Sequence, residues 1–213
     1  MTIRVLLADD HVLLREGLRA LLASSPGIAV VAEVGDGREA LRRSEELKPD
    51  VLVMDVSMPG LNGIEAAQLV RARCPQTQVV MLSMHSSSEH VFRALRAGAL
   101  GYVLKESAAT EVIAAVQAVH AGQRFLSPAL REMAAETTGN AGRAGPLDSL
   151  SVRERQVLQL VVEGKSSAMI ARIVHLSPKT VETYRSRLMK KLGVPDVPSL
   201  VKFALQHGLT PPA

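Results

Sequence analysis

Polar side chains that suit cation and anion binding follow four apolar runs of this sequence. Asp9 and Asp10 come after IRVLLA, Asp55 after VLVM, Ser83 at the end of VVMLS, and Lys105 after GYVL. Carboxylate oxygens are the ligands that hard divalent cations prefer, and an ammonium group beside them favours an anion. The natural pair of ligands for this set is Mg²⁺ and a phosphoryl group.

Those residues must be positioned by the strands that precede them. Strands are predicted over residues 3–8, 29–34, 51–54, 79–83 and 101–104, because unbroken apolar runs are typical of strands buried on both faces of a sheet. Helical patterns lie between them, such as the stripe Leu14, Leu18, Leu21 and Leu22. Five alternating units predict an α/β fold with a doubly wound five-stranded parallel sheet, whose ligands bind outside the carboxyl ends of the strands.

The charge of the chain is divided unevenly. Residues 147–213 hold ten Lys and Arg against five Asp and Glu, whereas the rest holds 15 against 16. A basic domain joined to a nearly neutral one indicates an anionic polymer as a partner of the second. We expect a cytoplasmic protein without a membrane partner, because no signal peptide or long apolar run is visible and Cys74 is the one cysteine.

A change in composition separates the two parts. Residues 134–149 (AAETTGNAGRAGPLDS) are small and polar without periodicity, which is typical of a linker. We predict an α/β domain over 1–131, a linker over 132–148 and a small all-α domain over 149–213. In the last, Ser151 and Glu154 form a capping-box pattern, Ser177-Pro178 begins a helix and Gly193 ends it.

The first part resembles the receiver domain of bacterial response regulators. The matching segments are LLADDH, VMDVSMPGLNG, MLSMH and GYVLK, in that order. The resemblance implies that Asp55 accepts a phosphoryl group from a cognate sensor histidine kinase. It also implies a flavodoxin-like sheet that brings the five polar residues to one edge.

The resemblance assigns a role to each polar residue of that edge. Asp10 and Asp55 would bind Mg²⁺ directly, Asp9 through water, and Ser57 through its backbone carbonyl. Lys105 would contact a phosphoryl oxygen and Ser83 would hydrogen-bond another. Tyr102 resembles the aromatic switch residue of the family, although an ordinary half-buried strand position is the alternative. Five histidines lack metal-ligand spacing and are interpreted as surface or packing residues: His11, His90, His120, His175 and His207.

The second part, residues 150–192, resembles the LuxR-type helix-turn-helix, and the two together resemble the NarL/FixJ group of response regulators. Glu182, Thr183 and Ser186 match the positions that read bases from the third helix of this domain. The remaining predicted DNA contacts are phosphate contacts from Lys179, Thr180, Tyr184, Arg187, Lys190 and Lys191. The chain departs from the family pattern at Tyr184, where His is frequent, and at Ser167-Ala168-Met169, where a polar run is common.

The leading hypothesis is a transcription regulator that is phosphorylated at Asp55, dimerises and binds double-stranded promoter DNA. The resemblance favours dimerisation through a face that includes the first and fifth helices, near Leu13, Arg15 and Val116. A DNA-binding protein with a vestigial receiver is the second possibility. An enzyme is the third, and no nucleophile elbow, metalloprotease motif or P-loop supports it. A small helical bundle with a solvated basic face is the alternative for the second part.

Overall fold

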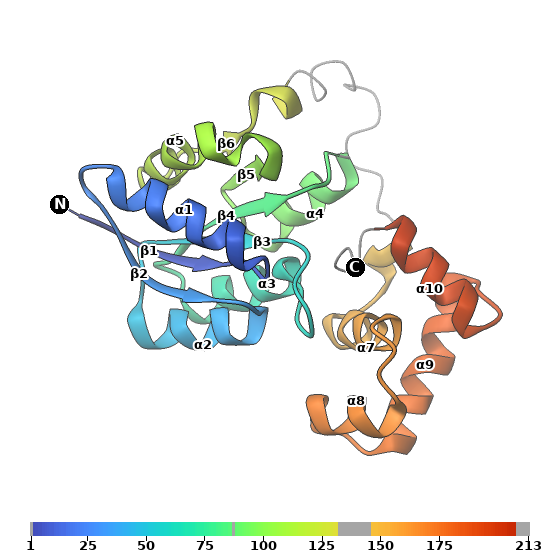
Figure 1. The fold of residues 1–213 in the computed structure, drawn as a ribbon. Helices are drawn as coiled ribbons and strands as arrows, with labels where there is room; N and C mark the ends of the chain where they lie inside the picture. Colours follow the sequence, from blue (N-terminus) through green and yellow to red (C-terminus); the bar gives the residue numbers. More distant parts are fainter. Residues whose placement is uncertain (1, 87, 132–145, 208–213) are drawn as a thin grey trace.

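The computed structural model describes residues 2–86, 88–131 and 146–207 (Figure 1). Strands and helices alternate in the described residues up to 131, whereas the described residues from 146 are helical and lie beside them. Within the described residues, no helix is long and apolar enough to cross a membrane.

A single parallel sheet forms the centre of the α/β domain. Its strands are β1 (Ile3–Ala8), β2 (Ile28–Val34), β3 (Val51–Asp55), β4 (Gln78–Ser83), β5 (Gly101–Leu104) and β6 (Phe125–Leu126). They are ordered β2-β1-β3-β4-β5-β6 and every neighbouring pair is parallel. The order reverses between β1 and β3, as in a doubly wound sheet.

The five predicted strands are confirmed, and a sixth strand extends the edge beyond β5. It is held by the Phe125 N–H, which donates to the Leu100 carbonyl at 3.0 Å, and by the Ser127 N–H, which donates to the Tyr102 carbonyl at 3.0 Å. The predicted number of five strands is corrected to six. Two residues are too few to show a period-2 pattern, so the sequence could not indicate this strand.

Helices cover both faces of the sheet, which confirms the doubly wound architecture (Figure 1). They are α1 (Val12–Ser24), α2 (Gly37–Leu47), α3 (Gly63–Arg73), α4 (Ser88–Ala97) and α5 (Ala108–His120). Helices α2, α3 and α4 pack into one apolar cluster with one face of the sheet, and α1 and α5 pack into a second cluster with the other face.

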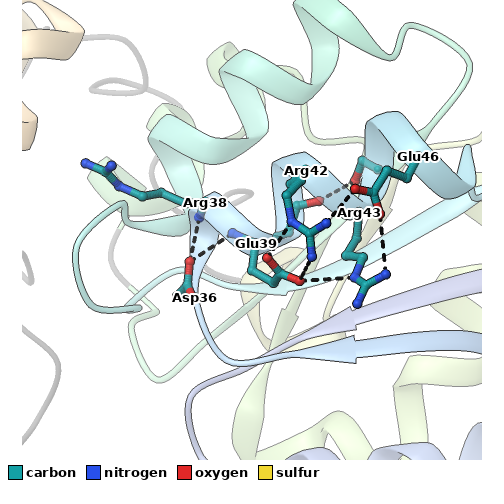
Figure 2. Close-up of polar contacts among 8 residues, drawn as sticks. Asp36, Arg38, Glu39, Arg42, Arg43 and Glu46 are labelled. Atoms are coloured by element: carbon teal, nitrogen blue, oxygen red, sulfur yellow. Dashed lines mark hydrogen bonds and ion pairs between the residues drawn. The ribbon is translucent and has the colours of Figure 1, made fainter. Parts of the chain in front are cut away.

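Helix α2 illustrates how local sequence fixes a helix end. The Asp36 side chain accepts hydrogen bonds from the N–H groups of Arg38 and Glu39, both at 2.9 Å (Figure 2). These bonds satisfy donors that the first turn leaves without partners. Ion pairs then cover the exposed face, joining Glu39, Arg42, Arg43 and Glu46. Figure 2 shows the Arg38 side chain pointing away from this network.

The helical domain contains a short 3-10 turn and four helices. They are η2 (Pro146–Ser149), α7 (Val152–Val162), α8 (Ser167–Val174), α9 (Pro178–Leu192) and α10 (Val197–Gln206). Both hydrogen bonds of the predicted capping box at Ser151 and Glu154 are present. The Ser177 side chain caps α9 by accepting from the Thr180 N–H at 3.1 Å, and Gly193 ends that helix with φ of +66°.

Most of the predicted linker, residues 132–148, lies outside the described residues. The last residues of the predicted linker are described. They pack with the helical residues that follow, because Leu147 in η2 is fully buried in that core. Leu147 therefore packs with the predicted helical domain although it precedes residue 149. The rest of the predicted domain division stays a prediction.

Polar contacts join the two domains along α2, the β3–α3 connection, α3 and α4. Their partners lie on α7, at the end of α8 and after α10. The pairs are Arg38 Nη1 with the Ile173 carbonyl at 2.9 Å, Gly60 N with Glu163 Oε1 at 2.9 Å, Glu65 Oε1 with Arg155 Nε at 2.7 Å, and His90 Nε2 with the His207 carbonyl at 2.9 Å. These contacts use faces of the helical domain other than the outer face of α9.

Candidate functional site

Three carboxylates meet at the carboxyl edge of the sheet, where the sequence predicted them. Asp9 and Asp10 follow β1, and Asp55 ends β3. One ligand atom from each of these three residues and from His11 lies within 4.8 Å of the others. Asp9 and Asp55 are almost completely buried. The strand order explains the meeting, because β1 and β3 are neighbours and end at the same edge.

Lys105 joins two of these carboxylates. It follows β5, and its Nζ lies 2.9 Å from Asp9 Oδ2 and 2.8 Å from Asp55 Oδ2. The ammonium group therefore balances part of the negative charge that the sheet edge concentrates. The side chain is 5% exposed, so water screens this interaction little.

Burial controls the protonation of Asp55. Removal from water raises the pKa of Asp55 to about 7, the Lys105 ammonium works against that shift, and the Asp9 carboxylate adds to it. Burial alone would lower the pKa of Lys105, but the carboxylates of Asp55 and Asp9 hold it above its ordinary value. A nucleophilic carboxylate must be ionised, so further positive charge at this site would favour the ionised form of Asp55.

The oxygen donors fit a hard divalent cation. The buried Oδ1 of Asp10 lies 3.0 Å from the His11 Nδ1 and accepts no hydrogen bond from other described residues. Carboxylate oxygens of this kind are the ligands that Mg²⁺ takes. Ser57 also lies beside Asp55, because its N–H donates to Asp55 Oδ1 at 3.1 Å.

His11 is exposed, as predicted for a surface residue, and its ring also borders this cluster. Its N–H donates to Asp9 Oδ1 at 2.8 Å, and its Nδ1 lies 3.0 Å from Asp10 Oδ1 and 3.4 Å from Lys105 Nζ. The signal in the sequence was adjacency to two aspartates rather than the spacing of two metal ligands. A ring in this position borders the place where a phosphoryl group would enter.

The predicted switch residues Ser83 and Tyr102 both contact the segment that follows β4. Ser83 ends β4 and its Oγ accepts a hydrogen bond from the His85 N–H at 2.9 Å. The Tyr102 hydroxyl donates to the His85 carbonyl at 2.8 Å, and burial raises the pKa of Tyr102 to about 12. Tyr102 is fully buried rather than half-buried. Both side chains therefore fix the segment that leaves β4.

Gly63 is a positioning residue that the sequence analysis did not identify. A Cβ atom at this position would lie 2.0 Å from the carbonyl oxygen of Asp55. The Gly63 N–H donates to the Val56 carbonyl at 2.9 Å, so α3 begins directly against the end of β3. Only glycine allows this approach, and the approach fixes the backbone that carries Asp55.

Helix α9 presents most of the predicted DNA contacts to solvent. The exposed ones are Lys179, Glu182, Thr183, Ser186, Arg187, Lys190 and Lys191. Lys191 Nζ lies 2.8 Å from Glu154 Oε1, so this predicted phosphate contact already has an acidic partner. Thr180 and Tyr184 are half-buried, Thr180 lies against the Ser177 cap at 2.8 Å, and Tyr184 packs against the domain core. The predicted phosphate contact of Tyr184 therefore competes with a packing role. Arg185, which donates to Ser167 Oγ at 3.1 Å, fastens α9 to α8.

The fold and the two sites define a receiver domain joined to a helix-turn-helix domain, and comparison with known proteins agrees. Residues 5–117 match the model of the response regulator receiver domain. Residues 148–204 match the model of bacterial regulatory proteins of the luxR family. The chain belongs to the receiver-plus-LuxR response regulators, the NarL/FixJ type.

Relatives match over nearly the whole length. The response regulator GacA of Pseudomonas viridiflava is 38% identical, with 97% of each chain covered. A LuxR-family response regulator from Aurantimonas sp. SI85-9A1 has a solved structure with a TM-score of 0.63 at 41% identity, covering 66% of this chain and all of that one. The RcsB–DNA complex gives a TM-score of 0.61 at 26% identity, covering 96% and 98%.

Proposed function

We propose that this chain is a transcription regulator controlled by phosphorylation of Asp55. The observation that carries the proposal is the contact of Lys105 Nζ with both Asp9 and Asp55 at the sheet edge, at 2.9 and 2.8 Å. It provides an acceptor carboxylate and a cation for the incoming phosphoryl oxygens in one place. A sensor histidine kinase is the proposed donor.

Phosphoryl transfer asks for positioning and charge neutralisation more than for covalent chemistry. A carboxylate oxygen of Asp55 forms a bond to phosphorus while the bond from phosphorus to the donor nitrogen breaks. The Lys105 ammonium is placed to pair with a phosphoryl oxygen. The Ser83 hydroxyl still has its proton to donate, since its oxygen accepts from the His85 N–H.

Mg²⁺ is the proposed cofactor. Asp10 and Asp55 would bind it directly, Asp9 through water, and the Ser57 carbonyl would complete the protein ligands. The ion would supply positive charge against the carboxylates and the phosphoryl oxygens. Because burial raises the pKa of Asp55 to about 7, that charge would also favour the ionised, nucleophilic form of the acceptor.

The proposed output is binding to double-stranded promoter DNA through α9. Its exposed residues are grouped as a recognition helix requires, with Glu182, Thr183 and Ser186 toward the N-terminal half. Lys179, Arg187 and Lys190 are placed for phosphates. The similarity to RcsB, whose structure is that of a DNA complex, supports this assignment. We propose a regulatory role without an enzymatic one, carried out in the cytoplasm.

We propose that phosphorylation of the receiver controls DNA binding through dimerisation. Two linked recognition helices bind a symmetric operator more tightly than one does. The three residues that mark the predicted face differ in exposure. Leu13 on α1 is 84% exposed, but Val116 on α5 is fully buried in the core and cannot contact a second copy. Arg15 is half-buried, since it hydrogen-bonds the Asp9 carbonyl. The proposed face is therefore centred on Val12 and Leu13.

The test compares genomic fragments captured by the full chain and by Asp55→Asn, each treated with Mg²⁺ and acetyl phosphate. Sequencing should show a discrete set of fragments that phosphodonor treatment enriches with the natural chain and leaves unchanged with Asp55→Asn. Equal enrichment by both proteins would support the DNA-binding protein with a vestigial receiver instead.

A further inference from the structure

Strand β6 pairs with the first residues of β5, and a side chain takes over where these pairs end. The pairing reaches Tyr102, which lies opposite Leu126. The Leu104 N–H lies beyond that pair and donates to the Ser127 hydroxyl, with 3.0 Å between N and Oγ. On this edge, the end of β5 that leads into Lys105 is therefore held by a hydroxyl group.

Ser127 is fixed in place by its own backbone. The residue is fully buried, and its N–H donates to the Tyr102 carbonyl at 3.0 Å. Its carbonyl accepts from the Leu130 N–H at 2.9 Å. The turn that follows Ser127 thus uses the carbonyl, and the hydroxyl is directed at β5. A side chain held in this way can set the position of the peptide that it binds.

Glu111 of α5 sets the direction of this hydroxyl. The Ser127 O–H donates to Glu111 Oε2. A hydroxyl group has one proton to donate and two lone pairs that accept. Because the proton lies on the carboxylate, the oxygen presents a lone pair to the Leu104 N–H. The Leu104 carbonyl accepts from Ser107 Oγ at 3.2 Å, so the peptide groups on both sides of Leu104 are held.

The position of Leu104 matters because Lys105 is the next residue. Lys105 Nζ lies 2.9 Å from Asp9 Oδ2 and 2.8 Å from Asp55 Oδ2. Loss of the Ser127 hydroxyl would leave the N–H of the buried Leu104 without this partner, which is costly. The peptide would shift toward another acceptor, and the base of the Lys105 side chain would shift with it.

We propose that Ser127 is a positioning residue of the phosphorylation site, and that it acts on Lys105 through the Leu104 peptide. The inference rests on the proposed phosphorylation of Asp55, in which the Lys105 ammonium pairs with a phosphoryl oxygen. Phosphoryl transfer depends on the placement of such charges more than on covalent chemistry. Glu111 contributes by orienting the Ser127 hydroxyl.

The test is the rate at which acetyl phosphate labels Asp55 in the full chain with Mg²⁺, measured over a range of donor concentrations. Ser127→Ala should lower the saturating rate by about tenfold, because a misplaced charged group slows transfer. The KM for acetyl phosphate should change little, because the charge of Lys105 is used mainly in the transition state.

Ser44→Ala is the matched control. Ser44 is also fully buried, and its hydroxyl donates to the Ala40 carbonyl at 2.7 Å within α2. This variant loses a buried hydroxyl without touching β5, so it should be labelled at the natural rate.

Two variants of Glu111 separate positioning from a general loss of structure. Glu111→Leu removes the acceptor of the Ser127 proton and should slow labelling in the same direction as Ser127→Ala. Glu111→Gln keeps an oxygen that accepts this proton, so it should restore the rate that Glu111→Leu loses. Urea denaturation shows whether each variant is folded, and the Glu111 pair decides the matter if Ser127→Ala does not fold.

The inference is wrong if Ser127→Ala is labelled as fast as the natural chain, if Ser44→Ala loses as much, or if KM alone changes. It is also wrong if both Glu111 variants behave alike. In each of these outcomes the natural chain is still labelled, so the phosphorylation of Asp55 stands. A natural chain that takes no label would overturn the proposed function and this inference together.

Discussion

Burial of the Asp55 carboxyl group makes the stability of the folded protein depend on pH. Its pKa is about 7 in the folded protein, against an ordinary value of 3.8, and burial is the largest cause. At a pH between these two values, the Asp55 carboxyl group is ionised in the unfolded chain and protonated in the folded chain. The metal-free protein should therefore lose stability as the pH rises from about 4 through about 7.

Asp55→Asn should consequently stabilise the metal-free protein at pH 8, by about 2 kcal/mol in the free energy of unfolding. At pH 5 the difference should be much smaller, because the natural side chain is then protonated in the folded state. Urea denaturation in the presence of a chelator measures both values. A variant that is less stable than the natural chain at pH 8 contradicts the assigned pKa.

The difficulty of predicting single residues is visible at His11 and Tyr184. Aspartates at strand ends are assigned from the sequence, since parallel topology brings such ends together. The contact of the His11 ring with this cluster was not predicted, because it depends on the direction in which the ring points. Tyr184 was assigned to phosphate, but its ring packs against the core, and helical spacing alone does not separate these uses.

At the scale of elements, the start of α3 sets the position of the phosphoacceptor strand. Gly63→Ala should displace the end of β3, because the new Cβ would lie 2.0 Å from the Asp55 carbonyl oxygen. We expect a loss of stability of about 1–3 kcal/mol and slower phosphorylation. Denaturation and the rate of acetyl phosphate labelling measure these effects.

Gly17→Ala provides the control, since Gly17 lies within α1 and a Cβ there would meet no atom within 4 Å. This variant should gain about 0.5–1 kcal/mol from helix propensity and label at the natural rate. If both glycine variants behave alike, the close approach of α3 to β3 has no role in placing Asp55.

Helix α9 should divide into residues that read bases and residues that hold phosphates. Thr183→Ala should change binding unequally among operator variants, by about 1–3 kcal/mol at a contacted base pair. Lys190→Ala should weaken binding to all of them and reduce the salt dependence by about one unit. Both positions are exposed. The opposite pattern in a titration series at several salt concentrations would show that the helix register is wrong.

Strands and capped helices were predictable because each has a local signature. Apolar runs indicated β1 to β5, and Ser151, Ser177 and Gly193 indicated the helix ends. Strand β6 has two residues and leaves no such signature. The docking of α7 against the β3–α3 connection was not predictable either, because the contacts between Gly60 and Glu163 join residues that are far apart in sequence.

At the scale of the whole molecule, the exposed apolar residues Val12 and Leu13 on α1 suit a contact with a second copy. Phosphorylation should convert monomers to dimers, and Leu13→Arg should prevent this without slowing the labelling of Asp55. Light scattering before and after treatment with acetyl phosphate measures the mass. An unchanged mass in the natural chain, together with unchanged DNA affinity, would exclude control by dimerisation.

Every proposed response of this protein depends on phosphorylation of Asp55. Site-resolved mass spectrometry of the full chain after incubation with Mg²⁺ and acetyl phosphate tests it most directly. One phosphoryl group on Asp55 is expected, dependent on Mg²⁺ and absent from Asp55→Asn. Undiminished labelling of Asp55→Asn on another residue, or no labelling of the natural chain, would show that Asp55 is not the phosphoacceptor.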